Sequence, residues 1–170
     1  MPDRAGWVRP DLTGDLARGR VQRVLLWPDP VLLTRCDPAG YLTGPELRQL
    51  AADLLVTMYE AGGRGLAAPQ IGVLRRVFVM DAGWKDGRPA PLIAADPEIT
   101  APSDARDTAS ETCLSIPGRP VDMDRPEAVT LNHYDLDGIF RSLRLTGPAA
   151  RIAQHEADHL DGRLILKDPA

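Results

Sequence analysis

The segment AQHEADHL, residues 153–160, constrains the fold of this 170-residue chain more than any other. His155 and His159 stand four residues apart, and Glu156 follows the first histidine directly. On an α-helix, residues four apart lie on one face, so both imidazoles can reach a single ion while the adjacent carboxylate stays free. The segment therefore predicts a partly buried helix. Two buried imidazoles and a buried carboxylate would be costly without a partner, which favours a metal site over a polar surface patch.

Composition excludes several classes of protein. A hydrophobic content of 44% and a charged content of 26% are typical of a globular domain. The net charge of −4 argues against nucleic-acid binding, and no apolar run approaches the roughly 18 residues of a membrane helix. The first twenty residues lack the apolar core of a signal peptide. Only two cysteines are present, so we expect a reducing, cytoplasmic environment and no disulfide framework.

The chain mixes helices with short strands. Thr43 and Glu46 form a capping-box pattern before a helix that ends near Gly62. After the loop GRGLAAPQIG, strand-like segments follow at residues 75–81, 91–100 and 111–118. Residues 128–147 are interpreted as two strands joined by a turn at Asp137-Gly138, and the last helix is expected over residues 148–160. The pattern predicts an α+β domain of antiparallel strands packed around a central metal-binding helix.

A catalytic metal needs a third protein ligand, and the sequence offers several. Downstream of the helix the only acidic residue after Gly162 is Asp168, so the ligand is expected upstream. His133 lies in a predicted strand, where a half-exposed structural histidine is the simpler explanation. Cys36 lies in a turn. Cys113 is the best choice, because thiolate binds borderline divalent ions well and small residues surround it.

Three short motifs in order resemble the signature motifs of the peptide deformylases. They are GRGLAAPQ at residues 63–70, ETCLS at 111–115 and QHEADHL at 154–160. The resemblance extends to WPDPVLL near the start and covers about residues 22–168. It implies a peptide-deformylase-like catalytic domain over residues 21–170. Residues 1–20 are then an N-terminal arm that we expect to be dispensable for chemistry.

The resemblance also implies a role for each site residue. Cys113, His155 and His159 would bind one divalent ion, Fe²⁺ in the native protein, with Zn²⁺, Ni²⁺ or Co²⁺ able to replace it. Glu156 would act as general base and then general acid. The side-chain amide of Gln70 and the backbone N–H of Leu114 would stabilise the oxyanion.

Further residues would shape and support this site. Glu111 and Arg125 match positions that form an ion pair in the family, and we interpret the pair as support for the cysteine strand. Gly65 would allow a peptide to approach the loop closely. Two residues depart from the family pattern: Arg64 replaces an aliphatic residue at the substrate pocket, and Thr112 replaces a glycine.

The leading hypothesis is a metal-dependent hydrolase that removes the formyl group from N-formylmethionyl N-termini of newly made polypeptides. One alternative is a specialised paralogue that hydrolyses another formamide or small N-acyl compound, suggested by Arg64 and Thr112. A second is a non-catalytic metal-stabilised binding protein, which would not need Glu156. A generic zinc endoprotease fits least, because the third ligand is an upstream cysteine. The expected partner is a formylated peptide N-terminus, with a transient ribosome contact; we expect a monomer, no nucleic acid and no membrane.

Overall fold

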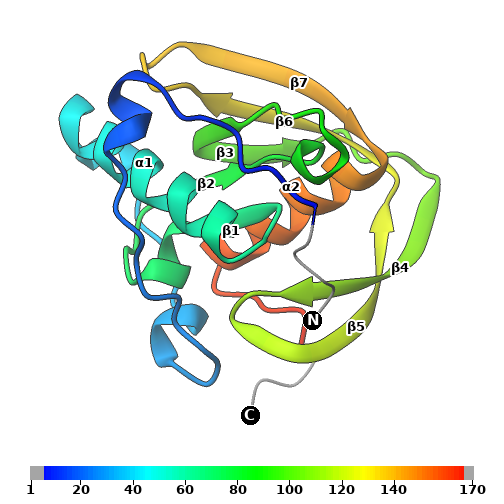
Figure 1. The fold of residues 1–170 in the computed structure, drawn as a ribbon. Coiled ribbons are helices and arrows are strands. Elements are labelled where there is room, and N and C mark those ends of the chain that lie inside the picture. The colour runs from blue at the N-terminus through cyan, green and yellow to red at the C-terminus, as the bar shows by residue number, and fades with distance from the viewer. Residues whose placement is uncertain (1–5, 167–170) are drawn as a thin grey trace.

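The computed structural model describes residues 6–166, which form two β-sheets and two α-helices (Figure 1). The larger sheet is antiparallel, and its strand order is β1-β2-β3-β6-β7. Its strands are β1 (Gly65–Ala67), β2 (Val77–Met80), β3 (Leu92–Thr100), β6 (Ala128–Tyr134) and β7 (Phe140–Thr146). The smaller sheet is a long antiparallel pair of strands, β4 (Arg106–Cys113) and β5 (Ile116–Pro126). This mixture of helices and antiparallel sheet confirms the predicted α+β class.

Helix α1 (Gly44–Glu60) begins where the sequence predicts. The Thr43 hydroxyl accepts a hydrogen bond from the Glu46 backbone N–H, and the Glu46 carboxylate accepts one from the Thr43 backbone N–H at 2.7 Å. This reciprocal capping box satisfies donors that a helix start would otherwise leave unpaired. The helix ends at Glu60, Ala61 is its C-cap, and Gly62 follows with a φ of +72°.

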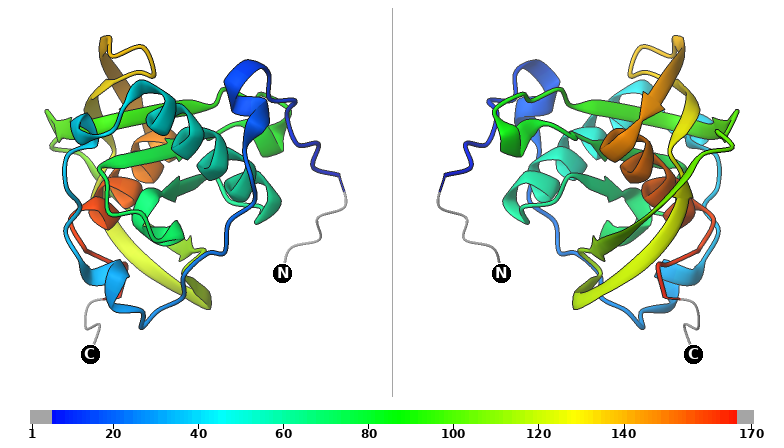
Figure 2. Two further views of the ribbon diagram at one scale, coloured as in Figure 1. Left: turned by 90° about the vertical axis from the view of Figure 1, so that its left-hand side faces the viewer. Right: turned by 90° about the vertical axis from the view of Figure 1, so that its right-hand side faces the viewer.

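At β1 and β2 the larger sheet is buried on both faces, one under each α-helix. Leu66, Val77 and Val79 pack in the same core cluster as Leu54 and Leu55 of α1. The alternate residues of β1 and β2 pack instead with α2 (Gly147–Leu160), in a second cluster that includes Ala67, Phe78, Met80, Ala153 and Leu160. Since strand side chains alternate between faces, the two helices lie on opposite sides of the sheet (Figure 2).

Within residues 6–166, five short 3₁₀ helices precede or connect these elements. They are η1 (Gly14–Arg18), η2 (Pro30–Leu33), η3 (Ala39–Tyr41), η4 (Ala68–Ile71) and η5 (Trp84–Asp86). Helix η4 follows β1 directly in the sequence. Helix η5 follows β2, which pairs with β1, so both 3₁₀ helices lie close to β1 at the edge of the larger sheet.

Most predicted elements are present, with differences in two glycine- and proline-rich segments. The β6–β7 hairpin turns at Gly138, whose φ is +74°, and the last helix lies within one residue of its predicted start. The segment 111–118 is not one strand: β4 ends at Cys113 and β5 begins at Ile116, with a turn between them. The expected loop after α1 contains the three-residue strand β1 and the helix η4.

The described part of the N-terminal arm, residues 6–20, packs against α1 and does not extend freely. Trp7, Leu12 and Leu16 contact the core cluster on the α1 face of the sheet. The backbone N–H of Arg20 donates to the Asp53 carboxylate at 2.8 Å. Three apolar residues among glycines, prolines and charged residues are too few to establish a helical or strand period, so the sequence pattern did not predict this packing.

No helix within residues 6–166 is long and apolar enough to cross a membrane.

Candidate metal centre

Helix α2 places two imidazoles side by side near its C-terminal end. The Nε2 atoms of His155 and His159 are 3.2 Å apart, and His159 is 1% exposed. Residues four apart on a helix share a face, and on that face of α2 the two rings contact Glu111 and Cys113 of β4. Both nitrogens therefore point into the protein interior.

The end of β4 supplies the third donor. The Sγ atom of Cys113 is 3.5 Å from Nε2 of His159, and one ligand atom from each of the three residues lies within 4.8 Å of the other two. Cys113 is buried and has no disulfide partner. Among residues 6–166, this is the group of His, Cys, Asp and Glu side chains that could hold a metal ion.

The chemistry of these donors fits a divalent ion. Two imidazole nitrogens 3.2 Å apart can share at most one proton, so at least one presents a bare lone pair to the other. Burial lowers the pKa of His159 well below its usual range, which favours the neutral ring that binds metals. A thiolate and two imidazoles, which bind metals in their deprotonated and neutral forms, make a soft-to-borderline set that suits iron, cobalt, nickel or zinc, and a bound ion would take the place of a proton on His155.

The other two candidate ligands lie elsewhere. Cys36 is buried in the core cluster under α2, and burial raises the pKa of its thiol to about 11, so it stays protonated and inert. His133 is buried and not half-exposed as expected; its Nδ1 lies 3.2 Å from the Tyr134 carbonyl oxygen. Asp168 lies outside the described residues.

Glu111 fixes the orientation of His155. Its Oε1 lies 2.9 Å from Nδ1 of that ring, which directs Nε2 towards the other donors. Burial would raise the pKa of Glu111, but its hydrogen bonds with His155 and Arg125 lower it to about 2. Burial would likewise lower the pKa of His155, but its hydrogen bonds with Cys113 and Glu111 raise it to about 10. A permanently ionised carboxylate therefore lies behind this ligand.

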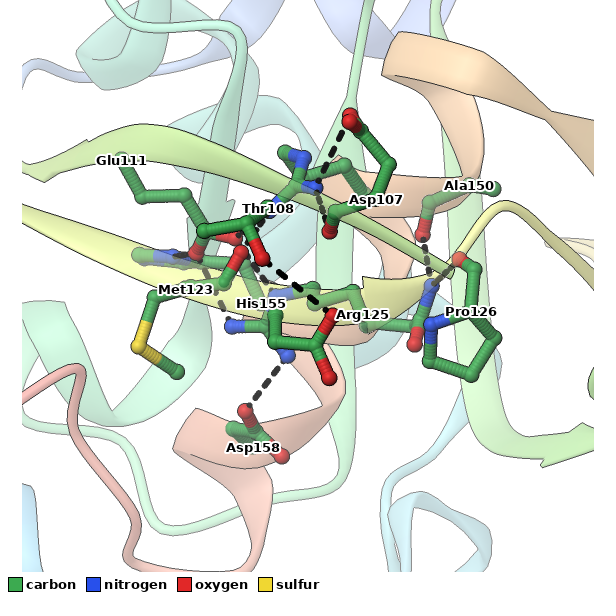
Figure 3. Close-up of polar contacts among 12 residues, drawn as sticks. Asp107, Thr108, Glu111, Met123, Arg125, Pro126, Ala150, His155 and Asp158 are labelled. Atoms are coloured by element: carbon green, nitrogen blue, oxygen red, sulfur yellow. Dashed lines mark hydrogen bonds and ion pairs between the residues drawn. The ribbon is translucent and has the colours of Figure 1, made fainter. Parts of the chain in front are cut away.

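The same carboxylate is held by two arginines (Figure 3). Arg125 donates from Nε to Glu111 at 2.6 Å and from Nη1 to Asp158 at 3.0 Å, so it joins β4 and β5 to α2. Arg151 donates to the same Glu111 at 2.8 Å and to the Met123 carbonyl. Each of these buried charges has more than one hydrogen-bonding partner, so none is left uncompensated. Together they hold β4, which carries Cys113, against α2.

We expect Glu111→Gln to weaken metal binding about 10- to 100-fold, because the neutral amide holds the His155 ring less firmly and makes it less basic. The dissociation constant for Zn²⁺ or Co²⁺, measured by competition with a chelating dye, checks this. Asp122→Asn is the control, since Asp122 is exposed on β5. Equal affinities for parent and Glu111→Gln would contradict a supporting role for Glu111.

Glu156 lies beside the three donors and belongs to none of their mutual contacts. It is 4% exposed, and its Oε2 is buried with no hydrogen-bond partner. Burial raises the pKa of this carboxyl to about 7, which suits a group that must take and return a proton at neutral pH. A carboxylate oxygen left without a partner inside a protein is expensive, which marks Glu156 as a candidate functional residue.

Gly65 makes room for this carboxylate. A Cβ atom on Gly65 would lie 2.4 Å from Glu156 Oε1, closer than any van der Waals contact allows. A Cβ on Gly63 would likewise lie 2.8 Å from Cδ1 of Leu114. The two glycines therefore let the chain before β1 approach both the carboxylate and the turn after Cys113.

Gln70 points its amide at the donor set. Its Oε1 accepts a hydrogen bond from the Ala67 backbone N–H at 3.0 Å, which fixes the direction of the side chain. Its Nε2 lies 3.1 Å from Ser115 Oγ and 3.7 Å from Cys113 Sγ. The N–H groups are thus aimed at the space beside the cysteine, as an oxyanion donor requires.

The two residues that depart from the family pattern lie away from the donors. Arg64 immediately precedes β1, and its side chain points to the opposite face of the chain from Gly65. Its guanidinium lies 3.5 Å from the Asp86 carboxylate in η5. Thr112 is exposed, between two buried neighbours on β4, so its side chain points away from the Cys113 thiol.

Three supporting residues were not predicted from the sequence: Arg151, Asp158 and Ser115. Arg151 stands four residues before His155, and this spacing could have placed it on the same face of the helix. Asp158 and Ser115 carry no such signal, because their partners Arg125 and Gln70 are distant in the sequence.

An α+β fold with a buried thiolate-and-imidazole set beside an unpaired carboxylate defines a metal-dependent hydrolase. The family model described as polypeptide deformylase matches residues 21–169. The chain belongs to the polypeptide deformylase family, whose members are metal-dependent enzymes that deformylate newly made polypeptides.

Relatives and solved structures agree with this assignment. The chain is 40% identical to a peptide deformylase of Mesorhizobium japonicum over 146 residues, 86% of this chain and 82% of the relative. It is 42% identical to one from Brucella suis over 147 residues, 86% of this chain and 83% of that relative. The crystal structure of peptide deformylase from Thermotoga maritima superposes with a TM-score of 0.79 at 35% identity, covering 86% of this chain and 95% of that one. A Met-Ala-Ser-bound peptide deformylase from Acinetobacter baumannii gives 0.79 at 31% identity, covering 86% and 97%.

Proposed function

We propose that this protein hydrolyses the formyl group from N-formylmethionyl N-termini of newly made polypeptides, with α2 as its metal-binding helix. The convergence of Cys113, His155 and His159 within 4.8 Å, beside the unpaired carboxylate of Glu156, is the observation that carries the proposal. Binding alone would not need that carboxylate, so this feature favours catalysis over the alternative of a metal-stabilised binding protein.

Cys113, His155 and His159 would hold a divalent ion, which would lower the pKa of a bound water to about 7 and so supply a nucleophile at neutral pH. Glu156 would accept a proton from the attacking water as the new bond to the formyl carbon forms. The carbon–nitrogen bond then breaks, and Glu156 returns the proton to the departing amine, which leaves formate and a free N-terminus. Gln70 and the backbone N–H of Leu114 are the donors that we assign to the developing oxyanion.

The open edge of β1 offers a path for the peptide. The Arg64 carbonyl accepts from the Asp81 N–H on the side of β2, and bonding alternates along an antiparallel strand, so the backbone groups of Gly65 point outwards. Because β1 is the last strand of the sheet, a peptide can lie along this edge as an added strand. Such a peptide would present its N-terminus to Glu156. The Met-Ala-Ser complex of the Acinetobacter baumannii enzyme supports a short methionyl peptide as the ligand.

Release of formate from formyl-Met-Ala-Ser, compared with a panel of other formamides and N-acetyl peptides, tests the proposal. We expect formyl-methionyl peptides to give the highest kcat/KM. A higher value for an unrelated formamide would favour the specialised paralogue, and no hydrolysis by metal-loaded protein would favour a binding protein.

Arg64→Ile should change kcat/KM for formyl-Met-Ala-Ser by less than about 3-fold, because Arg64 pairs with Asp86 on the far side of Gly65. Steady-state kinetics on metal-loaded protein check this, with Arg88→Ile as a control for loss of charge near the same loop. A gain of about 10-fold or more for methionyl substrates would instead place Arg64 in the substrate pocket and favour the specialised paralogue.

The native metal, the cellular location and the oligomeric state complete the proposed function. We propose Fe²⁺ as the native ion, a cytoplasmic location, a monomeric state and a transient contact with the ribosome, where formylated N-termini emerge. Anaerobic purification followed by elemental analysis, and light scattering for the molecular mass, test the first and third of these.

A further inference from the structure

The N-terminal arm reaches a cluster of aromatic residues behind the substrate path. Trp7 contacts Trp84 of η5 edge to face, with ring centroids 5.8 Å apart, and Trp84 contacts Tyr59 of α1 in the same way at 5.2 Å. The Lys85 ammonium lies 3.9 Å from the centre of the Trp7 ring. Edge-to-face aromatic pairs and cation–π contacts are both stabilising, so the arm is anchored at this point.

Trp84 connects this cluster to the chain that borders the site. Its indole N–H donates to the Gly63 carbonyl at 2.9 Å, and the side chain is 4% exposed. The Asp81 backbone N–H donates to the next carbonyl, that of Arg64, at 2.8 Å. The buried Asp81 carboxylate is in turn held by the Tyr59 hydroxyl at 2.7 Å. Two consecutive carbonyls are therefore fixed from behind by groups that pack on the aromatic cluster.

The side of the Gly63–Gly65 segment that faces Leu114 and Glu156 is closely packed. A Cβ on Gly65 would lie 2.4 Å from Oε1 and 2.9 Å from Cγ of Glu156, and a Cβ on Gly63 would lie 2.8 Å from Cδ1 of Leu114, so a side chain at either position would displace its neighbour. A small shift of the segment therefore moves the outward-facing backbone groups of Gly65, which a peptide lying along this edge would bond, and so weakens peptide binding.

We infer that Trp7 is a positioning residue for the deformylation reaction, acting through Trp84 on the Gly63–Gly65 segment. This inference rests on the proposed function, and it assigns a role in substrate binding to an arm that lies before the residues matched by the family model. The arm then remains dispensable for the chemical step and for metal binding, as the sequence led us to expect, but not for substrate binding.

Trp7→Ala in the full-length, metal-loaded protein should raise KM for formyl-Met-Ala-Ser about 10-fold, with kcat within about 2-fold of the parent and the metal content unchanged. Trp7→Phe, which keeps an aromatic edge, should restore most of the loss. Leu16→Ala is the matched control, because Leu16 packs on the core from the same arm. It should lower thermal stability without raising KM.

A double-mutant cycle tests the connection through Trp84. Trp84→Phe keeps an aromatic ring but removes the indole N–H that donates to the Gly63 carbonyl, so it should reproduce the rise in KM. If Trp7 acts through Trp84, adding Trp7→Ala to Trp84→Phe should raise KM by less than the product of the two single effects. Multiplicative effects, or an unchanged KM in a folded Trp7→Ala protein, would overturn the inference.

Amide hydrogen exchange separates failure of this inference from failure of the proposed function. In Trp7→Ala, residues 63–66 should exchange at least about 5-fold faster than in the parent, while Leu16→Ala should leave their rates unchanged. If the parent protein does not release formate, the proposed function fails and the exchange rates alone decide the positioning role. Unchanged exchange in these residues would overturn it.

Discussion

Glu156→Ala is expected to lower kcat/KM for formyl-Met-Ala-Ser by about 1000-fold while the protein keeps its metal and its fold. The carboxylate lies beside the three donor atoms and is not one of them, and its Oε2 has no hydrogen-bond partner. Removing it therefore deletes the group that moves the proton and leaves every ligand in place. Formate release and elemental analysis of the same preparation measure the two quantities together.

The control for this substitution is Glu60→Ala, because Glu60 is an exposed carboxylate at the end of α1. It should leave kcat/KM within about 2-fold of the parent. Thermal unfolding should show no loss of stability in Glu156→Ala, since a buried carboxylate oxygen without a partner costs about 1–3 kcal/mol. Activity within tenfold of the parent, or loss of the metal, would contradict the role assigned to Glu156.

Cys113→Ala should abolish measurable hydrolysis by removing the metal. The thiolate supplies the only negative charge in the donor set, and two imidazoles alone bind a divalent ion weakly. The loss of affinity should exceed the roughly 10- to 100-fold that follows loss of an outer partner such as Glu111. Dialysis against a limiting concentration of Co²⁺, followed by elemental analysis and activity, measures the effect.

Cys36→Ala is the control that distinguishes the loss of a metal ligand from the loss of any buried thiol. Cys36 is equally buried, but it packs in the core under α2 away from the donors. Its replacement should lower stability slightly and leave one equivalent of metal bound. Retention of metal with unchanged affinity in Cys113→Ala would show that the ligand has been misassigned.

The sequence predicted the parts of this fold that local chemistry determines. Thr43 and Glu46 cap α1 as expected, and the turn at Gly138 joins β6 to β7, because both signals act between neighbouring residues. The pairing of two histidines on α2 follows from helical spacing alone. Cys113 could be preferred from its chemistry, whereas the oxyanion donors and the native ion came only from the resemblance to the family.

The sequence did not predict what depends on tertiary packing. Nothing near Asp158 or Ser115 indicates their contacts with Arg125 and Gln70, which are brought together only when α2 and η4 pack beside the smaller sheet. Strand β1 was expected to be a loop, because its sequence is too short and too rich in small residues to show a period of two. The anchoring of the arm by Trp7 was missed for a similar reason, since a single aromatic residue has no periodicity.

The shortness of β1 also bears on how the sheet avoids unwanted association. A long exposed edge strand invites pairing with other chains and aggregation, and natural proteins limit such edges with short strands and prolines. Strand β1 has three residues, of which Leu66 and Ala67 are buried, and Pro69, which lacks an N–H, follows in η4. An extended segment of another protein would gain only a few backbone hydrogen bonds here, each adding about 1 kcal/mol. The edge is therefore long enough to hold the first residues of a nascent chain, and too short to act as a template for fibre growth.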